Sequence, residues 1–417
     1  MSASRQPFPR DFYLVTAANF VFFLNFATFF LLPLHLTALG ASAETVGFVM
    51  GTAGFAGLCV LPFLGALLDR VDRRRFTIAG AAVMALASFG YLAPVGLGPA
   101  LYALRIVQGV AFTAAFVAAS TLAVDLAPPA RRGQALGIFG ISTLLTHAIA
   151  PALGEQIAAR WGFGALFAVA GGLGLAAVAL SAAVRVPRRG HAAASAAPAA
   201  LARPLRRTPL VWMAAATMVA CGMGFGAVLT FVPTFLHAIG IAQVAPFFVS
   251  YTLAAVAVRI VLGGLSDRVG RRRVLLPAIV TLAISILALG TVSSVPALVV
   301  VGLLFGAGQG MTYPTANAMM VDLSHRGNLG RVQTLFAGSF SVGVAASAFV
   351  FGGVIERWGY PTMFASAAAC TALGGGLLWL APREAAVIDA ALAPAAGLDD
   401  PETFADPPAP SLRASVR

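Results

Sequence analysis

Apolar segments long enough to cross a membrane recur along almost the whole chain and constrain its fold more than any other feature. Each has about 20 residues, enough for a helix to cross roughly 30 Å of hydrocarbon. We expect twelve transmembrane helices, near residues 12–36, 45–68, 76–94, 99–124, 134–155, 163–184, 210–236, 244–265, 274–293, 297–320, 330–354 and 361–381. The sequence therefore predicts an all-α integral membrane protein that crosses the bilayer many times.

The composition agrees with a lipid environment. Of the 417 residues, 59% are hydrophobic and 10% are charged, whereas soluble proteins average roughly 45–50% and about 25%. A net charge of +12 could suit nucleic acid, but the basic residues lie in short clusters between apolar segments, so we expect no nucleic-acid partner. Cys59, Cys221 and Cys370 lie in separate apolar segments, so no disulfide framework, metal site or cofactor is expected.

The basic residues are distributed very unevenly between the two ends of the predicted helices. All 27 are arginines; 23 lie at the end that holds residues 70–75 and 268–273, and only Arg160 and Arg357 lie at the other. Cytoplasmic loops of membrane proteins carry an excess of basic residues. We therefore expect a multi-pass protein of a bacterial inner membrane with both termini in the cytoplasm.

A segment rich in Ala, Pro and Arg, residues 185–209, divides the predicted spans six and six. It is typical of a flexible basic linker, here on the cytoplasmic side, between an N-terminal bundle (1–184) and a C-terminal bundle (210–384). Residues 385–417 are rich in Ala, Pro and Asp, and we expect them to form a disordered cytoplasmic tail.

The two predicted bundles repeat one another in sequence, with five short matches at offsets of 197 to 201 residues. The matches pair Gly65, Asp69 and Arg70 with Gly263, Asp267 and Arg268; Pro33 and Gly40 with Pro233 and Gly240; Gln108 and Gly109 with Gln309 and Gly310; Asp125 with Asp322; and Arg160, Trp161 and Gly162 with Arg357, Trp358 and Gly359. Each unit holds six spans, an even number, so the copies share one orientation. Parallel repeats of this kind enclose a central site, which favours alternating access and activity as a monomer.

The arginine-rich loops carry the most specific motif. The second loop, which runs from Gly263 to Arg273, has the pattern G-x3-D-R-x-G-R-R, and the first has Asp72 where the second has Gly270. This pattern resembles the major facilitator superfamily, over about residues 12–384, and is most similar to its twelve-span proton-coupled drug and sugar efflux branch. The resemblance implies that these loops hold the bundles together on the cytoplasmic side when the protein faces outward. The expected gating residues are Gly65, Asp69, Arg70, Arg73, Gly263, Asp267, Arg268, Gly270 and Arg271.

Ionisable residues inside or at the ends of spans are functional candidates because charge in hydrocarbon is costly. Arg105 resembles the fourth-span signature of proton-coupled members; the alternative is a structural hydrogen bond to the backbone of the first helix. His147 could change charge near neutral pH, or could be a neutral buried histidine. Glu155 is either a proton carrier or the ion-pair partner of Arg160. Arg259 is expected to reach toward the cytoplasmic face and pair with an acid.

Polar residues within the spans are candidates for the substrate cavity. Gln309, Tyr313 and Asn317 are spaced four apart beside Pro314 and would share one helix face near a kink. Asn25 in the first span and Gln108, one turn after Arg105, complete the set.

These features favour a secondary active transporter that exports a small amphipathic organic molecule in exchange for protons. Two alternatives stay open: uptake or facilitated diffusion of a sugar or organic acid, and a non-transporting membrane receptor. We do not expect an enzyme, because the sequence lacks a zinc-protease motif, a nucleophile elbow with a partnered base and a phosphate-binding glycine loop.

Overall fold

The computed structural model describes residues 7–70, 72–128, 131–185, 209–323 and 329–381. Every regular element in these ranges is a helix, which confirms the predicted all-α class. The first half contains α1 (Arg10–Thr28), η1 (Phe29–Leu31), α2 (Leu32–Ala38), α3 (Ala43–Arg70), α4 (Arg73–Gly90), α5 (Pro99–Leu126) and α6 (Arg132–Ala183). The second half contains α7 (Pro209–Ala238), α8 (Ala245–Leu262), α9 (Leu265–Val269), α10 (Arg271–Leu289), α11 (Val295–Asp322) and α12 (Leu329–Leu380). The predicted linker lies almost wholly outside the described residues, and the predicted tail lies entirely outside them.

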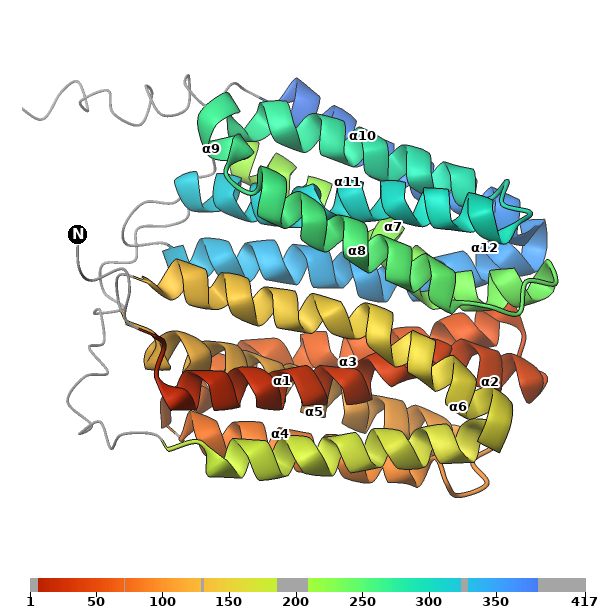
Figure 1. Ribbon diagram of the computed structural model, residues 1–417. Coiled ribbons are helices and arrows are strands. Elements are labelled where there is room, and N and C mark those ends of the chain that lie inside the picture. The colour runs from red at the N-terminus through yellow and green to blue at the C-terminus, as the bar shows by residue number, and fades with distance from the viewer. Residues whose placement is uncertain (1–6, 71, 129–130, 186–208, 324–328, 382–417) are drawn as a thin grey trace, which may run out of the picture.

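Nine helices in the described ranges are long and apolar enough to cross a membrane. Two of them, α6 and α12, have 52 residues each, about 78 Å of helix and far more than one crossing needs. Each turns back on itself, at Gly162 in α6 and Gly359 in α12 (Figure 1). α4 has 18 residues but begins with three arginines, so the expected total of twelve crossings depends on this helix.

The turns at one end of the molecule reproduce the sequence repeat in three dimensions. Four glycines adopt the left-handed conformation that side chains with a Cβ rarely tolerate, with φ of +85° at Gly40, +79° at Gly240, +81° at Gly162 and +79° at Gly359. They form two pairs, 200 and 197 residues apart, and each pair occupies the same place in its half. We call this end of the molecule, which holds these four turns, the opposite end.

The other end, which we call the arginine end, carries Arg73, Arg74, Arg271 and Arg272 and repeats its side-chain contacts as well. Arg73 forms an ion pair with Asp125 on α5, and Arg271 pairs with Asp322 on α11 at 2.7 Å. One residue further on, Arg74 donates to the backbone carbonyls of Ser181 and Ala182, and Arg272 donates to those of Trp379 and Ala381. In the first half, therefore, consecutive arginines bind α4 to α5 and to the end of α6. In the second half they bind α10 in the same way to α11 and to the end of α12.

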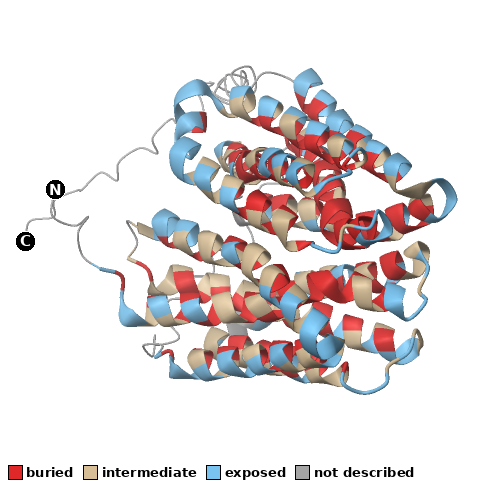
Figure 2. Ribbon diagram, turned by 45° about the vertical axis from the view of Figure 1, so that its right-hand side comes forward, coloured by how far each residue is buried: buried red, intermediate tan, exposed pale blue. Residues whose placement is uncertain are grey.

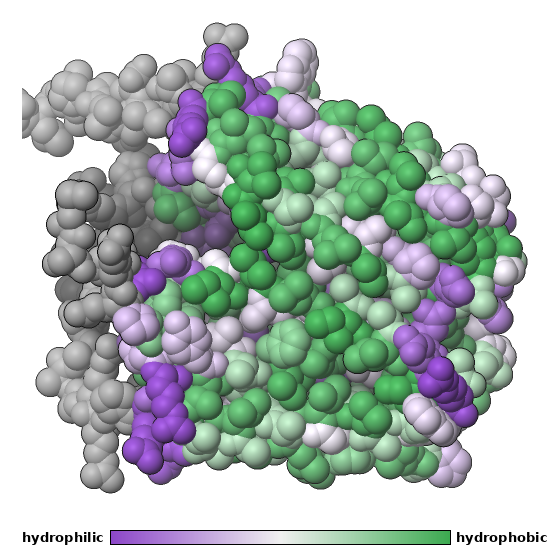
Figure 3. Space-filling view, in the orientation of Figure 1, coloured by the Kyte–Doolittle hydropathy of each residue, from purple (hydrophilic) through white to green (hydrophobic). Residues whose placement is uncertain are grey.

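The outer surface matches a bilayer. Large apolar side chains on the outside of the bundles are exposed, among them Phe63, Leu86, Val261 and Leu373, each at least 68% exposed. Hydrophilic residues gather at the two ends, with hydrophobic surface between them (Figure 3). Buried residues concentrate where helices pack against one another (Figure 2). A hydrophobic surface of this extent needs lipid around it.

The two halves meet mainly along two helix pairs, α3 with α12 and α6 with α8, and α2 and η1 also contact α7. Small residues allow a close approach between α3 and α12: Gly47 lies against the backbone of Ala348, and Gly54 lies against Ala345. A Cβ at Gly47 would collide with the carbonyl oxygen of Ala348. Glycine is therefore required there for the two helices to pack so closely.

The halves share one hydrophobic core in the middle and toward the opposite end, but not at the arginine end. The shared core includes Phe30 and Leu36 from the first half and Phe235 and Phe248 from the second. Toward the arginine end, three further cores each stay within one half. Two hold only first-half residues, one that includes Phe12 and a small one formed by Leu64 and Ala118, and the third holds only second-half residues, such as Met320. The molecule is thus closed across its halves at the opposite end.

Candidate functional site

Two glutamates bind helix N-termini across the interface and close the opposite end. Both carboxylate oxygens of Glu155 on α6 accept from the backbone N–H of Val244, at 3.2 and 3.1 Å, and Oε2 also accepts from Ala245 at 3.0 Å. These are the residues at which α8 of the other half begins. Glu356 on α12 makes the corresponding contact from the second half to the first. Its Oε2 accepts from the N–H of Ala43, the first residue of α3, at 3.1 Å. Both contacts place a negative charge at the positive end of a helix dipole.

The position of Glu155 contradicts one of the two alternatives that the sequence offered, an ion pair with Arg160. Arg160 is exposed, and the structure pairs it with no carboxylate in the described residues. The other alternative, a proton carrier, stays a prediction. Glu155 instead turns away from its own half, because the start of α8 offers free N–H groups that a carboxylate can satisfy.

His147 forms the central contact between the halves. Its Nδ1 lies 3.2 Å from the hydroxyl of Tyr251 on α8. The imidazole also packs edge-on against Phe30, with 5.1 Å between ring centroids, and Phe30 stacks on Phe248 of the second half at 5.8 Å. Any separation of α6 and η1 from α8 must therefore break the hydrogen bond of His147 and the aromatic contact of Phe30.

Arg105 lies inside the first half and all three of its nitrogens have acceptors. Nε donates to the carbonyl oxygen of Val49 at 3.2 Å and Nη2 to that of Met50 at 3.3 Å, while Nη1 donates to Oε1 of Gln108 at 3.0 Å. The structural alternative was expected to involve the backbone of the first helix, but the two backbone acceptors, Val49 and Met50, lie on α3. The reason is geometric: α5 packs directly on α3, where Gly109 lies against the backbone of Ala53. Arg105 therefore binds α5 to α3.

The other first-half candidates, Gln108 and Asn25, lie within the same bundle. Oε1 of Gln108 accepts a second hydrogen bond from the hydroxyl of Tyr91 at 3.0 Å, and its Nε2 is buried without a partner among the described residues. Asn25 is fully buried and donates to Ser88 Oγ at 3.0 Å and to the Ala170 carbonyl at 2.5 Å. Asn25 therefore connects α1, α4 and the returning part of α6.

The three candidates on α11, Gln309, Tyr313 and Asn317, follow one another at intervals of four residues and so share one face of the helix. Gln309 Oε1 and Asn317 Oδ1 are buried without a hydrogen-bond partner in the described residues. The ring of Tyr313 packs against Phe336 and Phe340, at 5.0 and 5.1 Å between centroids.

Arg259 on α8 binds the helix that carries these residues. Its Nε donates to the carbonyl oxygen of Gly310 at 3.2 Å. That oxygen would ordinarily accept from residue 314, but Pro314 has no N–H. Arg259 therefore does not pair with an acid at the cytoplasmic face, as we expected, but satisfies a carbonyl that a proline has freed.

The predicted gating residues lie at the arginine end, and the ion pairs and hydrogen bonds of those whose side chains the structure describes stay within one half. Arg271 bonds to Asp267, to Asp322 at 2.7 Å and to Ser266 Oγ at 2.8 Å. Gly270 joins α9 to α10 with φ of +102°, while Arg268 and Gly263 lie on the exposed surface nearby.

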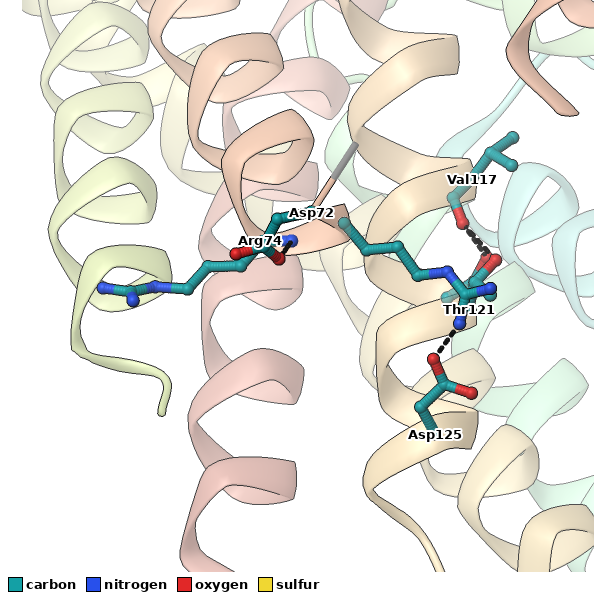
Figure 4. Close-up of polar contacts among 7 residues, drawn as sticks. Asp72, Arg74, Val117, Thr121 and Asp125 are labelled. Atoms are coloured by element: carbon teal, nitrogen blue, oxygen red, sulfur yellow. Dashed lines mark hydrogen bonds and ion pairs between the residues drawn. The ribbon is translucent and has the colours of Figure 1, made fainter. Parts of the chain in front are cut away.

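The first copy of the motif makes its turn differently. Asp72 caps α4, because its Oδ1 accepts from the N–H of Arg74 at 2.9 Å, with Asp125 nearby on α5 (Figure 4). Its φ of −56° needs no glycine, which explains why Asp72 can replace the glycine found at 270. Gly65, Asp69 and Arg70 lie on the last turns of α3, and their side chains fall outside the described set.

Two helical bundles that repeat one another and pack face to face, with a hydrophobic outer surface, define the class of membrane transporters built from parallel repeats. The chain belongs to the Major Facilitator Superfamily, whose family model matches residues 14–257 and 237–398. This membership confirms the predicted family and a transporter rather than a receptor.

Relatives of known name fall within the same family. The chain is 30% identical over 151 residues to the multidrug resistance protein MdtL of Shewanella oneidensis and 30% identical over 152 residues to that of Klebsiella pneumoniae. Each match covers 36% of this chain and a little over a third of the relative, 37% and 38%.

Solved transporter structures share the fold over nearly the whole chain. A mutant of the nucleoside transporter NupG superposes with a TM-score of 0.77 at 13% identity, covering 90% of this chain and all of that one. A D-xylose-proton symporter gives 0.75 at 14% identity, with 90% of this chain and 98% of that one covered. At these identities the likeness establishes the fold.

Sequence reasoning did not find Glu356, Tyr251 or the role of Arg259. Glu155 and Glu356 are 201 residues apart, within the offsets of the repeat, so aligning the acids of the two halves would have paired them. The four-residue spacing of Gly310 and Pro314 marks a free carbonyl, but which donor takes it depends on a neighbouring helix.

Proposed function

We propose that this protein is a secondary active transporter that exports a small amphipathic organic molecule in exchange for protons by alternating access. The observation that carries the proposal is the single hydrophobic core that joins the halves at the opposite end, beside separate cores at the arginine end. In this arrangement the conformation opens toward the arginine end. The likeness to the MdtL proteins supports efflux as the direction.

Within this proposal, individual residues are given roles in proton coupling and in closing the opposite end. His147 is the coupling residue, since it lies at the mid-level contact between the halves and its imidazole can take up a proton when that contact opens to water. Glu155 couples protonation to the outer closure, and Arg105 fixes the helix pair beside it. The arginine end is cytoplasmic, with both termini on that side, in a bacterial inner membrane. The bundles comprise residues 1–184 and 210–384, and the protein works as a monomer.

The loops at the arginine end have their own part in the cycle. In the outward-facing state, residues of the two motif copies, such as Arg73, Asp267 and Arg271, meet across the halves. In the conformation described above they are held apart and bond within their own half.

Transport into proteoliposomes tests the proposal. Purified protein is reconstituted, a panel of amphipathic compounds is added outside, and accumulation is followed with the interior made acidic. We expect accumulation that stops when a protonophore collapses the gradient, with protein-free liposomes as the control. Equal flux with and without the gradient would contradict proton coupling and favour the second candidate, uptake or facilitated diffusion of a sugar or organic acid.

A further inference from the structure

Arg259 is a cation inside the second half with no carboxylate to balance it. Between Glu155 and Glu356 the sequence contains only two acidic residues, Asp267 and Asp322. Both bond to Arg271 at the arginine end. The only protein acceptor of Arg259 in the described residues is the carbonyl oxygen of Gly310, which carries no charge.

The two Nη nitrogens of Arg259 are available to a ligand. The structure shows no acceptor for either among the described residues, and neither is among the fully buried unpaired atoms, so both reach accessible space. Arg105 is the informative contrast, since its Nε, Nη1 and Nη2 all have acceptors. Of these two arginines within the spans, Arg105 has a protein acceptor for every nitrogen, whereas both Nη atoms of Arg259 are without one in the described residues.

Arg259 lies on the face of α8 that packs on α11 and not on the lipid face. Tyr251, Ala255 and Arg259 follow one another at intervals of four residues, so they share a face of α8. That face packs on α11, where Gly306 lies against Tyr251 and Gly310 against Ala255. The lipid-facing side of α8 carries other residues, such as the exposed Leu253, Ile260 and Val261.

Two tyrosines and a histidine lie near enough to interact with the charge of Arg259: Tyr251 on α8, Tyr313 on α11 and His147 on α6. The rings continue in contact with one another: Tyr313 packs on Phe340 at 5.1 Å, Phe340 on Phe225 at 5.6 Å and Phe225 on Tyr251 at 6.5 Å between centroids. A ligand that binds here meets one fixed positive charge beside an apolar, aromatic wall.

We propose that Arg259 binds the anionic group of the transported molecule and that the substrates are amphipathic carboxylates. This inference rests on the proposed transport function and specifies its substrate class. A guanidinium presents paired N–H donors that match the two oxygens of a carboxylate, and the interaction strengthens away from bulk water. The aromatic rings accept the apolar body. In the described residues, the acids of the second bundle lie at its two ends, Asp267 and Asp322 at one and Glu356 at the other. The interior of the bundle therefore offers a cationic compound no carboxylate, and such a compound would meet repulsion from Arg259.

Binding to the purified protein in detergent tests this without any requirement for transport. The probes are a series of phenylalkanoates of increasing chain length, each paired with its neutral amide and its cationic amine of the same length, titrated by calorimetry. We expect at least one carboxylate to bind, with its amide and amine weaker by about tenfold or more. If no carboxylate in the series binds more tightly than its amide, the inference is overturned, even where gradient-driven export of other compounds is intact.

Substitutions locate the binding charge. Arg259→Gln should weaken carboxylate binding by about tenfold, and Arg259→Lys should weaken it less, because the ammonium keeps the charge and loses the fork. Arg160→Gln removes the same charge from an exposed turn at the opposite end and should bind as the unaltered protein does. Equal binding by Arg259→Gln and the unaltered protein would also overturn the inference. Should Arg259→Gln fail to fold, Arg259→Lys and the carboxylate-to-amide comparison still decide the matter. Carboxylate binding with no transport in liposomes would count against the proposed function alone.

Discussion

Glu155 and Glu356, 201 residues apart, make the same contact in opposite directions across the interface between the halves. Glu155 caps the start of α8 and Glu356 caps the start of α3. Each half thus supplies the carboxylate that satisfies a helix N-terminus of the other. Because the contacts exist only while the opposite end is closed, the pair stabilises this conformation over one that is open there.

Neutralising these carboxylates should open the opposite end. Glu155→Gln and Glu356→Gln each remove a charge from a helix N-terminus, a loss of about 1 kcal/mol per site, and the double variant should shift the population further than either alone. Spin labels at the exposed positions Leu39 and Ile239, in a background without native cysteines, would report a longer distance between the halves.

The matched control is Glu44→Gln, which removes a carboxylate from the same end. Glu44 makes no hydrogen bond across the interface in the described residues. If its distance distribution changed as much as that of the double variant, the effect would come from net charge and not from the caps.

The contact between His147 and Tyr251 should carry measurable coupling. A double-mutant cycle of His147→Phe and Tyr251→Phe keeps an aromatic ring at both sites and removes only the polar contact, which we expect to contribute about 0.5–1.5 kcal/mol. Thermal unfolding of the four proteins in detergent measures it. Additive effects of the two substitutions would mean that the hydrogen bond adds nothing.

His147 also has a role specific to coupling. His147→Gln should reduce gradient-driven export by about tenfold or more while leaving substrate exchange at equal pH measurable. Tyr251→Phe should keep its dependence on the gradient. If His147→Gln still accumulates substrate in proportion to the imposed gradient, the proton is carried elsewhere.

Arg105 should matter for stability first. Arg105→Ala removes three hydrogen bonds and a buried side chain between α5 and α3, at a cost of about 2 kcal/mol. Thermal unfolding should show a lower midpoint than for Arg160→Ala, where the side chain is exposed. Because every nitrogen is already satisfied internally, the protein that remains folded should still export in response to the gradient; loss of that response would assign Arg105 to coupling.

Pro314 and Arg259 should be energetically linked through the carbonyl of Gly310. Pro314→Ala restores an N–H that can bond to this oxygen within α11. Arg259→Gln should therefore destabilise the protein less in the Pro314→Ala background, by about 0.5–1.5 kcal/mol. Pro277→Ala, which changes another in-helix proline away from Arg259, provides the control. Equal costs of Arg259→Gln in all three backgrounds would contradict the link.

The sequence by itself determined that the chain is a helical membrane protein, that its halves repeat and where its charges lie. The surrounding lipid explains this, because each span must hydrogen-bond its own backbone N–H and C=O groups in hydrocarbon. Every span is therefore a helix formed by one continuous run of apolar residues, which can be recognised locally in the sequence. The turns at Gly40, Gly162, Gly240 and Gly359 were likewise visible as repeated glycines, because the left-handed conformation is a local demand.

Only the tertiary structure decided which end is closed and which partners the polar side chains take. Glu155 bonds to residue 244, His147 to residue 251, and Arg259 to Gly310, and each pair lies at least 51 residues apart on different helices. Such contacts depend on how two helices are rotated about their axes and how closely they approach, and a local segment of sequence does not determine either. A transporter that alternates between conformations adds a further reason, because the same sequence must fit both arrangements, and the packing selects one of them.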